Sequence, residues 1–220
     1  MGRIKQQVDY DWAGADASFQ RAVALEPANA ENVGFAAWSA AIFGRFDEAL
    51  ELNRRAVDLD PLDANSWGRL GETEVFMGKL DQAAGDCKKG LELNLDVSTV
   101  LIQIDLMQGR PQGALPEVDR VHNAPLRAFL YAHTYHALGR EKESDAALNE
   151  LITKYHASNA SETAMVYAFR DQTDKAFVWL DRAYAQRDPG LMSTKVEPLL
   201  KSLHNDPRYA AFLKKLNLSN

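Results

Sequence analysis

The sequence contains a single cysteine, Cys87, so it cannot form an intramolecular disulfide. It has no apolar run near the roughly 18 residues that a transmembrane helix needs, and its first residues lack the apolar core of a signal peptide. No basic run exceeds two residues, as at Lys88-Lys89, and the net charge is −6. Because nucleic acids and anionic membranes bind concentrated basic faces, we expect neither as a partner. Together these absences predict a cytoplasmic location.

The common catalytic motifs are also missing. The sequence contains no G-x-S-x-G, G-x-x-x-x-G-K-[ST] or G-x-G-x-x-G, which leaves no basis for a catalytic triad, a P-loop or a dinucleotide site. His133 and His136 are three residues apart, whereas zinc sites of the His-Glu-x-x-His kind need a spacing of four and a glutamate. Cys87 has no adjacent histidine to activate it. We therefore expect no catalytic residue, metal or cofactor, and predict that the chain is not an enzyme; a histidine-based enzyme is the least favoured alternative.

What the sequence does contain is a repeat. Three similar segments of eighteen residues begin 34 residues apart, at Tyr10, Gly44 and Gly78. Their superposition pairs small residues at Ala15, Ala49 and Ala83. Small and apolar residues recur within each segment at steps of three and four, which is typical of one helix face. Pro27 and Pro61 follow the last apolar position of their segments, where proline ends a helix because it cannot donate a backbone hydrogen bond.

A second helical stretch lies between Pro61 and Gly78, so each period predicts two antiparallel helices with a glycine at the turn. This arrangement resembles the tetratricopeptide repeat, whose first helix carries W-x2-L-G-x2-Y. The sequence has that pattern as Trp67, Leu70 and Gly71, with Glu74 in the place of the tyrosine. The resemblance implies an all-α fold, a right-handed α-solenoid of helix-turn-helix hairpins with one concave groove.

Looser copies of the repeat follow, opening at Gly109, Gly139 and Asp171. The short period before Gly109 predicts a first helix about one turn short that ends near Gln108, and Pro116 is expected to kink or shorten the helix that follows. We predict a solenoid over residues 1–190, with an incomplete first hairpin and about five further hairpins. Residues 191–220 are predicted to form a C-terminal cap of short helices, since Asp-Pro steps suit helix starts.

The first hairpin is predicted to be incomplete, because only nine residues precede Tyr10 and a full first helix with its lead-in would need about fifteen. We expect this to leave Trp12, Phe19 and Val23 poorly covered, and exposed apolar stripes usually mark interaction surfaces. Either the chain is a fragment of a longer protein, or this face pairs with a second copy as a homodimer.

The final segment and the stretch FRDQTDKAFVWLDRAY before it resemble the tetratricopeptide tails of bacterial signalling proteins. Such tails follow adenylate-cyclase-like, serine/threonine-kinase or winged-helix regulator domains. The sequence contains none of the catalytic or DNA-reading motifs of those domains. This resemblance implies a regulatory, scaffolding or self-associating tail.

In tetratricopeptide proteins the concave face is lined by the first helices, at positions out of phase with packing. The resemblance places these residues in a partner-binding groove: Glu31, Trp38, Asn65, Arg69, Glu72, Phe76, Gln103, Phe129, His133 and His136. Such a mixed apolar and polar groove suits an extended peptide or a partner helix. It does not resemble a carboxylate clamp, because Glu31 and Glu72 occupy places where the clamp needs Lys, Asn or Arg. For Trp38 and Phe76 the alternative is packing between hairpins.

The residues therefore favour a non-enzymatic protein–protein interaction module with a protein or peptide partner. The alternative is a regulatory or self-associating tail of a larger signalling protein.

Overall fold

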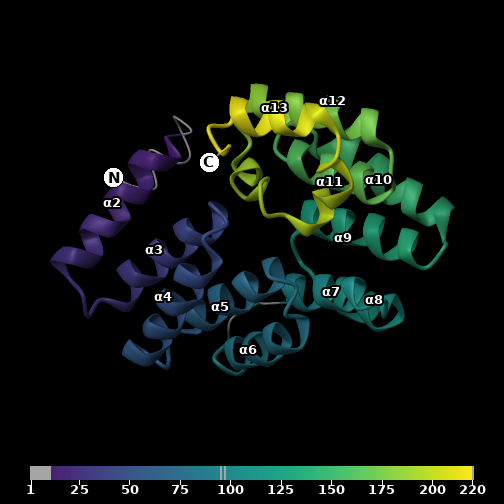
Figure 1. Cartoon of the computed structure of the whole chain (residues 1–220). Coiled ribbons are helices and arrows are strands. Elements are labelled where there is room, and N and C mark those ends of the chain that lie inside the picture. The colour runs from purple at the N-terminus through teal and green to yellow at the C-terminus, as the bar shows by residue number, and fades with distance from the viewer. Residues whose placement is uncertain (1–10, 95, 97, 220) are drawn as a thin grey trace. The chain divides into compact units, whose positions relative to one another are not determined.

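The computed structural model describes residues 11–94, 96 and 98–219, and this part of the chain is helical with no β-strand (Figure 1). The chain divides into two compact units. The first comprises Met1–Val100 together with Leu213–Asn220, and the second comprises Leu101–Phe212.

The first unit is built from helices that pack in chain order. They are α2 (Trp12–Leu25), α3 (Ala30–Ile42), α4 (Phe46–Leu59), α5 (Ala64–Phe76) and α6 (Leu80–Glu92). The helices α3 and α4 form one hairpin and α5 and α6 form the next, while α2 packs on α3 and α4 packs on α5 (Figure 1). The single helix α2 thus stands where the sequence predicts the second helix of an incomplete hairpin.

The second unit continues the series with helices of more varied length. They are α7 (Ser98–Met107), which begins before the boundary, α8 (Pro111–Asp119), α9 (Ala124–Ala137), α10 (Glu141–Tyr155), α11 (Ala160–Phe169), α12 (Thr173–Gln186), the 3₁₀ helices η1 (Pro189–Ser193) and η2 (Pro198–Leu203), and α13 (Pro207–Lys215), which ends in the first unit. The helices α9 and α10 form a hairpin, as do α11 and α12, and both 3₁₀ helices pack on α11.

Each hairpin turn uses the same backbone hydrogen bonds. In the first, the amide of Gly44 donates to Ala41 O (2.8 Å), and the amide of Arg45 donates to Ala40 O (2.9 Å). This closing pattern requires a left-handed residue after the helix, which glycine adopts without a steric penalty. The turn residues with positive φ are Gly44, Gly78, Gly109, Gly139 and, in the last hairpin, Asp171. The repeated glycine of the sequence is therefore explained by the turn.

The helix ends predicted from proline are confirmed. The helices α2 and α4 end two residues before Pro27 and Pro61. Helix α7 has 10 residues, whereas α3 and α5 have 13 each, so the first helix of this hairpin is one turn short as predicted. Helix α8 contains Pro116 and has 9 residues, against 15 in α10, which agrees with early termination by an internal proline.

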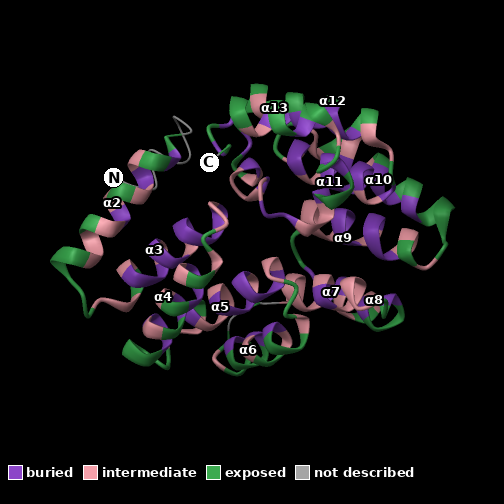
Figure 2. Cartoon of the chain, viewed as in Figure 1, coloured by how far each residue is buried: buried purple, intermediate pink, exposed green. Residues whose placement is uncertain are grey.

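The small residues of the repeat allow the helices to approach closely. Ala15, Ala49 and Ala83 are all fully buried. Figure 2 shows that buried residues occupy one side of most helices, with exposed residues on the other. Because an alanine face lets backbones come close, larger side chains fill only the spaces between these contacts. The eighteen repeated residues therefore form scaffold.

Four positions after each alanine, the three copies differ: the residues are Phe19, Asn53 and Cys87, and all are buried. Phe19 stacks on Phe35 with ring centroids 5.6 Å apart. Asn53 Nδ2 donates to Thr73 Oγ1 at 2.9 Å. Cys87 lies against Gly71, where an added Cβ would come within 2.5 Å of its Sγ. Each of these residues thus matches a residue of a first helix, which belongs to the next hairpin for Phe19 and Asn53 and to the same hairpin for Cys87.

The expectation that Trp12, Phe19 and Val23 on α2 are poorly covered is wrong. Trp12 is 1% exposed, and its Nε1 donates to the carbonyl oxygen of Leu216 at 2.5 Å. Phe19 is 7% exposed and packs with Ala15, while Val23 is half-buried against the same cluster. The cover comes from α3 and from residues 216–218, a contact that no local sequence pattern predicts. Tyr10 lies outside the described residues.

The carboxyl-terminal segment is helical, as expected, but η1 and η2 are 3₁₀ rather than α-helical. Asp188 caps η1 by accepting from the amide of Gly190 at 2.9 Å. Its other carboxylate oxygen accepts from the amides of Ala160 and Ser161 at the start of α11. The buried residues of η2 and α13 are Leu200, Leu203, Tyr209 and Phe212. A domain boundary after residue 190 stays a prediction.

Candidate functional site

The predicted groove residues of the first unit lie on one face of α3 and one face of α5. Their spacing of seven residues on each helix (Glu31 to Trp38, Asn65 to Glu72) keeps them in line. Glu31 and Asn65 are exposed, whereas Trp38 and Glu72 are half-buried. This face therefore combines accessible polar ends with partly buried aromatic and charged side chains.

The side chain of Arg69 extends from α5 to α3. Its guanidinium carbon is 5.1 Å from the centre of the Phe35 ring, and its Nη1 is 4.0 Å from Asp63 Oδ2. Gly34 makes room for this arrangement, because a Cβ at that position would be 2.6 Å from Nη1 of Arg69. Because Gly34 has no side chain, the guanidinium of Arg69 has room to lie over the ring of Phe35.

Glu72 lies one turn after Arg69 on the same helix. Burial raises the pKa of the Glu72 carboxyl, and the charge of Arg69 lowers it in part. A partly desolvated ion of this kind gains more from a hydrogen-bond donor on a partner than an exposed ion does.

Phe76 serves the packing between hairpins. It lies against the cluster of Ala40, Ala41 and Ala49 at the α3–α4 contact. Phe76 therefore has the packing role that the sequence left open as an alternative, and Trp38 stays a predicted groove residue.

In the second unit, Phe129 and His133 are buried, which corrects their assignment to a groove. The ring of His133 lies 4.4 Å from that of Phe129 and 5.0 Å from that of Phe169, and its Nδ1 is 3.0 Å from Phe129 O. Burial lowers the pKa of His133 to about 4, so the imidazole is neutral at pH 7. The cause of the burial is α11, which packs on α9 and supplies Phe169.

His136 and Gln103 keep part of their surface. The Nδ1 of His136 is 3.0 Å from the carboxylate of Glu141, in the first turn of the next helix. Gln103 donates from Nε2 to Glu197 Oε1 at 3.2 Å, and Glu197 in turn caps η2. Both side chains thus already have partners within their own unit.

The structure also bears on metal and thiol chemistry. Over residues 11–94, 96 and 98–219, no group of three or more His, Cys, Asp or Glu side chains is placed to hold a metal ion. Cys87 is buried, and burial, followed by the charge of Asp86, raises the pKa of its thiol to about 12. A thiol of this kind stays protonated at neutral pH. Within the same described part, no helix is long and apolar enough to cross a membrane.

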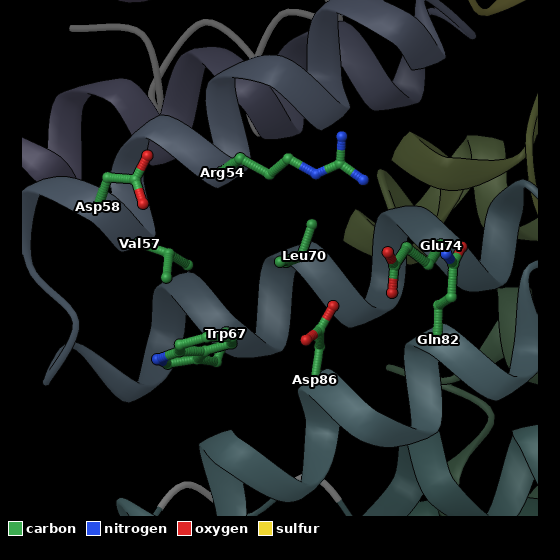
Figure 3. Close-up of a pocket in the computed structure, with 8 residues that line it drawn as sticks. All are labelled: Arg54, Val57, Asp58, Trp67, Leu70, Glu74, Gln82 and Asp86. Atoms are coloured by element: carbon green, nitrogen blue, oxygen red, sulfur yellow. The ribbon is translucent and has the colours of Figure 1, made fainter.

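One pocket in the first unit was not predicted from the sequence. It has a volume of about 420 Å³, lies among α4, α5 and α6, and is shown in Figure 3. Its walls are formed by Arg54, Val57, Asp58, Trp67, Leu70, Glu74, Gln82 and Asp86. The only local signal for it was Glu74, a buried acid at the position where the repeat usually has tyrosine.

No protein-family model matches the chain, and no curated protein matches it. Among solved structures it is similar to YrrB, a tetratricopeptide protein with an unusual peptide-binding site, with 18% identity and a TM-score of 0.51 over 90% of this chain and 97% of that one. It is also similar to MamA, with 15% identity and a TM-score of 0.39 over 84% of this chain and 94% of that one. The likeness to YrrB shows the fold: the predicted all-α solenoid of tetratricopeptide-type hairpins is confirmed.

Proposed function

We propose that the chain is a non-enzymatic protein–protein interaction module that binds an extended peptide or a partner helix along α3 and α5. The observation that carries the proposal is the pair Trp38 and Glu72, an aromatic ring and a partly desolvated acid that are half-buried on the first-helix face. Aromatic anchors beside satisfied polar groups are typical of peptide grooves. YrrB, which shares the fold, has a peptide-binding site.

The polar members of this face suit a partner with hydrogen-bond donors. Arg69 is already held by Phe35 and Asp63. Of the two acids on this face, Glu31 is exposed and Glu72 is half-buried, so Glu72 gains more from a hydrogen-bond donor on a partner. We expect the partner to place an apolar side chain against Trp38 and an amide or basic group against Glu72.

The alternative, a self-associating tail of a larger signalling protein, rests on sequence resemblance. The apolar stripe that suggested self-association is covered, since Trp12 and Phe19 are buried. The interaction module is therefore the function that the geometry supports better.

The proposal is tested by selecting peptides from a displayed random library on the purified chain and measuring the affinity of the enriched peptides by calorimetry. The variant Trp38→Ala with Glu72→Gln should weaken binding at least tenfold, because both anchors are lost. A matched control is Val178→Ala with Asp181→Asn on the exposed side of α12, which should bind as the wild type does. No enrichment, or equal affinity in the first variant, would contradict the proposal.

A further inference from the structure

Glu74 is the one acid of the pocket among α4, α5 and α6 that is fully withdrawn from solvent. It is 2% exposed, and its Oε2 is buried without a hydrogen-bond partner in the described part of the chain. In Figure 3 the carboxyl groups of Glu74 and Asp86 both point into the space beside Leu70. A buried acceptor without a donor is unfavourable by itself, so this atom indicates a group that is supplied from outside.

The charge of the pocket favours a cation. Its lining contains three acids, Asp58, Glu74 and Asp86, against one base, Arg54. An anion would be repelled when these acids are ionised, whereas a cation would lower their mutual repulsion. No group of three or more metal-ligating side chains occurs among the described residues, which favours an organic cation over a metal ion.

The remaining walls suit the stem of a long side chain. Trp67 and Leu70 contribute apolar surface, and the indole is held in place because its Nε1 donates to Pro61 O at 3.0 Å. A fixed indole beside carboxylates can pack methylene groups and attract the ammonium group at their end. An ammonium group presents three donors in a small volume, which matches two neighbouring carboxyl groups.

We propose that this pocket receives the side chain of a lysine from a partner protein, with Glu74 and Asp86 accepting hydrogen bonds from the ammonium group and Trp67 packing against its methylene groups. The site shares α5 with the proposed peptide face, but none of its lining residues belongs to that face, and its remaining walls come from α4 and α6. The two sites are therefore independent.

A protein side chain fits better than a free amine because the acidic surface continues. A second pocket of about 450 Å³ along α4 shares Arg54 and Asp58 with the first, and adds the acids Asp47 and Glu51 and the base Arg55, so that its acids outnumber its bases by three to two. A peptide whose lysine enters the first pocket would thus place neighbouring residues beside further acids. A free amine could not use this surface.

Binding of the cation should depend on pH through Glu74. Burial raises the pKa of this carboxyl to about 7, and both the charge of Asp86 on α6 and its side-chain hydrogen bond with Glu74 add to the rise. The charges of Arg54 on α4 and Lys79 before α6 oppose it. Only the ionised form attracts a cation, and the ionised fraction rises from about one tenth at pH 6 to about nine tenths at pH 8. The affinity should therefore be about tenfold higher at pH 8.

The experiment follows the indole N–H signal of Trp67 by NMR in the full chain. The probes are a blocked pentapeptide with a central lysine, its norleucine counterpart and n-butylammonium. We expect saturable shifts with the lysine peptide, about tenfold weaker binding at pH 6 than at pH 8, and no saturable shift with norleucine. Butylammonium should bind more weakly than the lysine peptide; equal binding would overturn the assignment to a protein side chain.

Glu74→Gln and Asp86→Asn should each weaken binding of the lysine peptide at least tenfold. Glu74→Gln should also remove the pH dependence of this binding. The control Glu92→Gln changes an exposed acid of α6 that lies outside the pocket, and it should bind as the wild type does. Undiminished binding by Glu74→Gln would overturn the proposal, as would equal binding of lysine and norleucine peptides. The last comparison uses the wild-type chain alone, so it holds even if a variant fails to fold.

The two proposals can fail separately. Trp38→Ala with Glu72→Gln should leave the lysine peptide unaffected, because neither residue lines this pocket.

Discussion

The guanidinium of Arg69 occupies the space that a side chain at Gly34 would need. An added Cβ there would lie 2.6 Å from Nη1 of Arg69, which is the far end of a flexible side chain. At Gly71 an added Cβ would meet Cys87 Sγ at 2.5 Å and the carbonyl oxygen of Ala83 at 3.2 Å. Two helical glycines thus keep close contacts of different kinds, one with a movable group and one with a packed helix.

We expect Gly71→Ala to lower the free energy of unfolding by about 1–3 kcal/mol, since α5 and α6 must separate. Gly34→Ala should be near neutral, because Arg69 can move aside and alanine favours a helix by about 1 kcal/mol over glycine. Urea unfolding of both variants measures the difference. Equal losses would show that Arg69 is as fixed as the packed helix.

Glu74 should make the protein less stable as the pH rises. Its pKa is about 7 in the folded chain and 4.5 without the fold, so the folded state holds its proton more tightly. The free energy of unfolding should fall between pH 4.5 and 7, by up to about 3 kcal/mol, and Glu74→Gln should lack this fall and exceed the wild type at pH 8. Urea unfolding across this range measures it. Glu92→Gln serves as the control and should keep the wild-type slope.

His133 should have the opposite dependence on pH. Burial lowers its pKa from 6.5 to about 4, so its contribution is complete above pH 6.5 and is lost as the pH falls toward 4. The loss should reach up to about 3 kcal/mol, because the unfolded chain gains a proton that the folded chain resists. Acid unfolding of His133→Phe should show a smaller slope between pH 6.5 and 4. His122→Gln, at an exposed position, should keep it, and an unchanged slope in His133→Phe would contradict the burial.

The last hairpin turn should be improved by a glycine. Asp171 has a φ of 55° where the other turns have glycine, and Gly139 in the preceding turn has a φ of 70°. Asp171→Gly should raise the melting temperature slightly, because it relieves up to about 1 kcal/mol of left-handed strain. Gly139→Ala should lower it by a similar amount. Calorimetry of the pair tests this, and a loss in Asp171→Gly would indicate that the aspartate makes a favourable contact instead.

The hairpins and their turns could be predicted because their causes are local. Gly44 and Pro61 act on the backbone next to them, and Ala49 shows its role by recurring every 34 residues. The burial of His133 could not be predicted, since it depends on Phe169 from another hairpin. The cover of Trp12 depends on Leu216, 204 residues away.

The pocket among α4, α5 and α6 could not be predicted from the sequence for a related reason. Its walls come from three helices, and among the side chains that carry its charge only Glu74 stands at a distinctive position of the repeat. The groove prediction from helix spacing stays a prediction for Trp38 and Glu72. It was wrong for Phe129 and His133, where the face that the phase predicts to be open is filled by a neighbouring helix.

The hydrogen bond from Trp12 to Leu216 changes how the first unit should open. In a repeat protein each terminal repeat contacts one neighbour and can fray alone. Here the first described helix is covered by the final residues of the chain, and Leu216 and Leu218 are fully buried. Loss of order at either end would expose apolar surface at the other. Helix α2 and residues 216–218 therefore share one opening event, and amide protection in these two segments should rise and fall together.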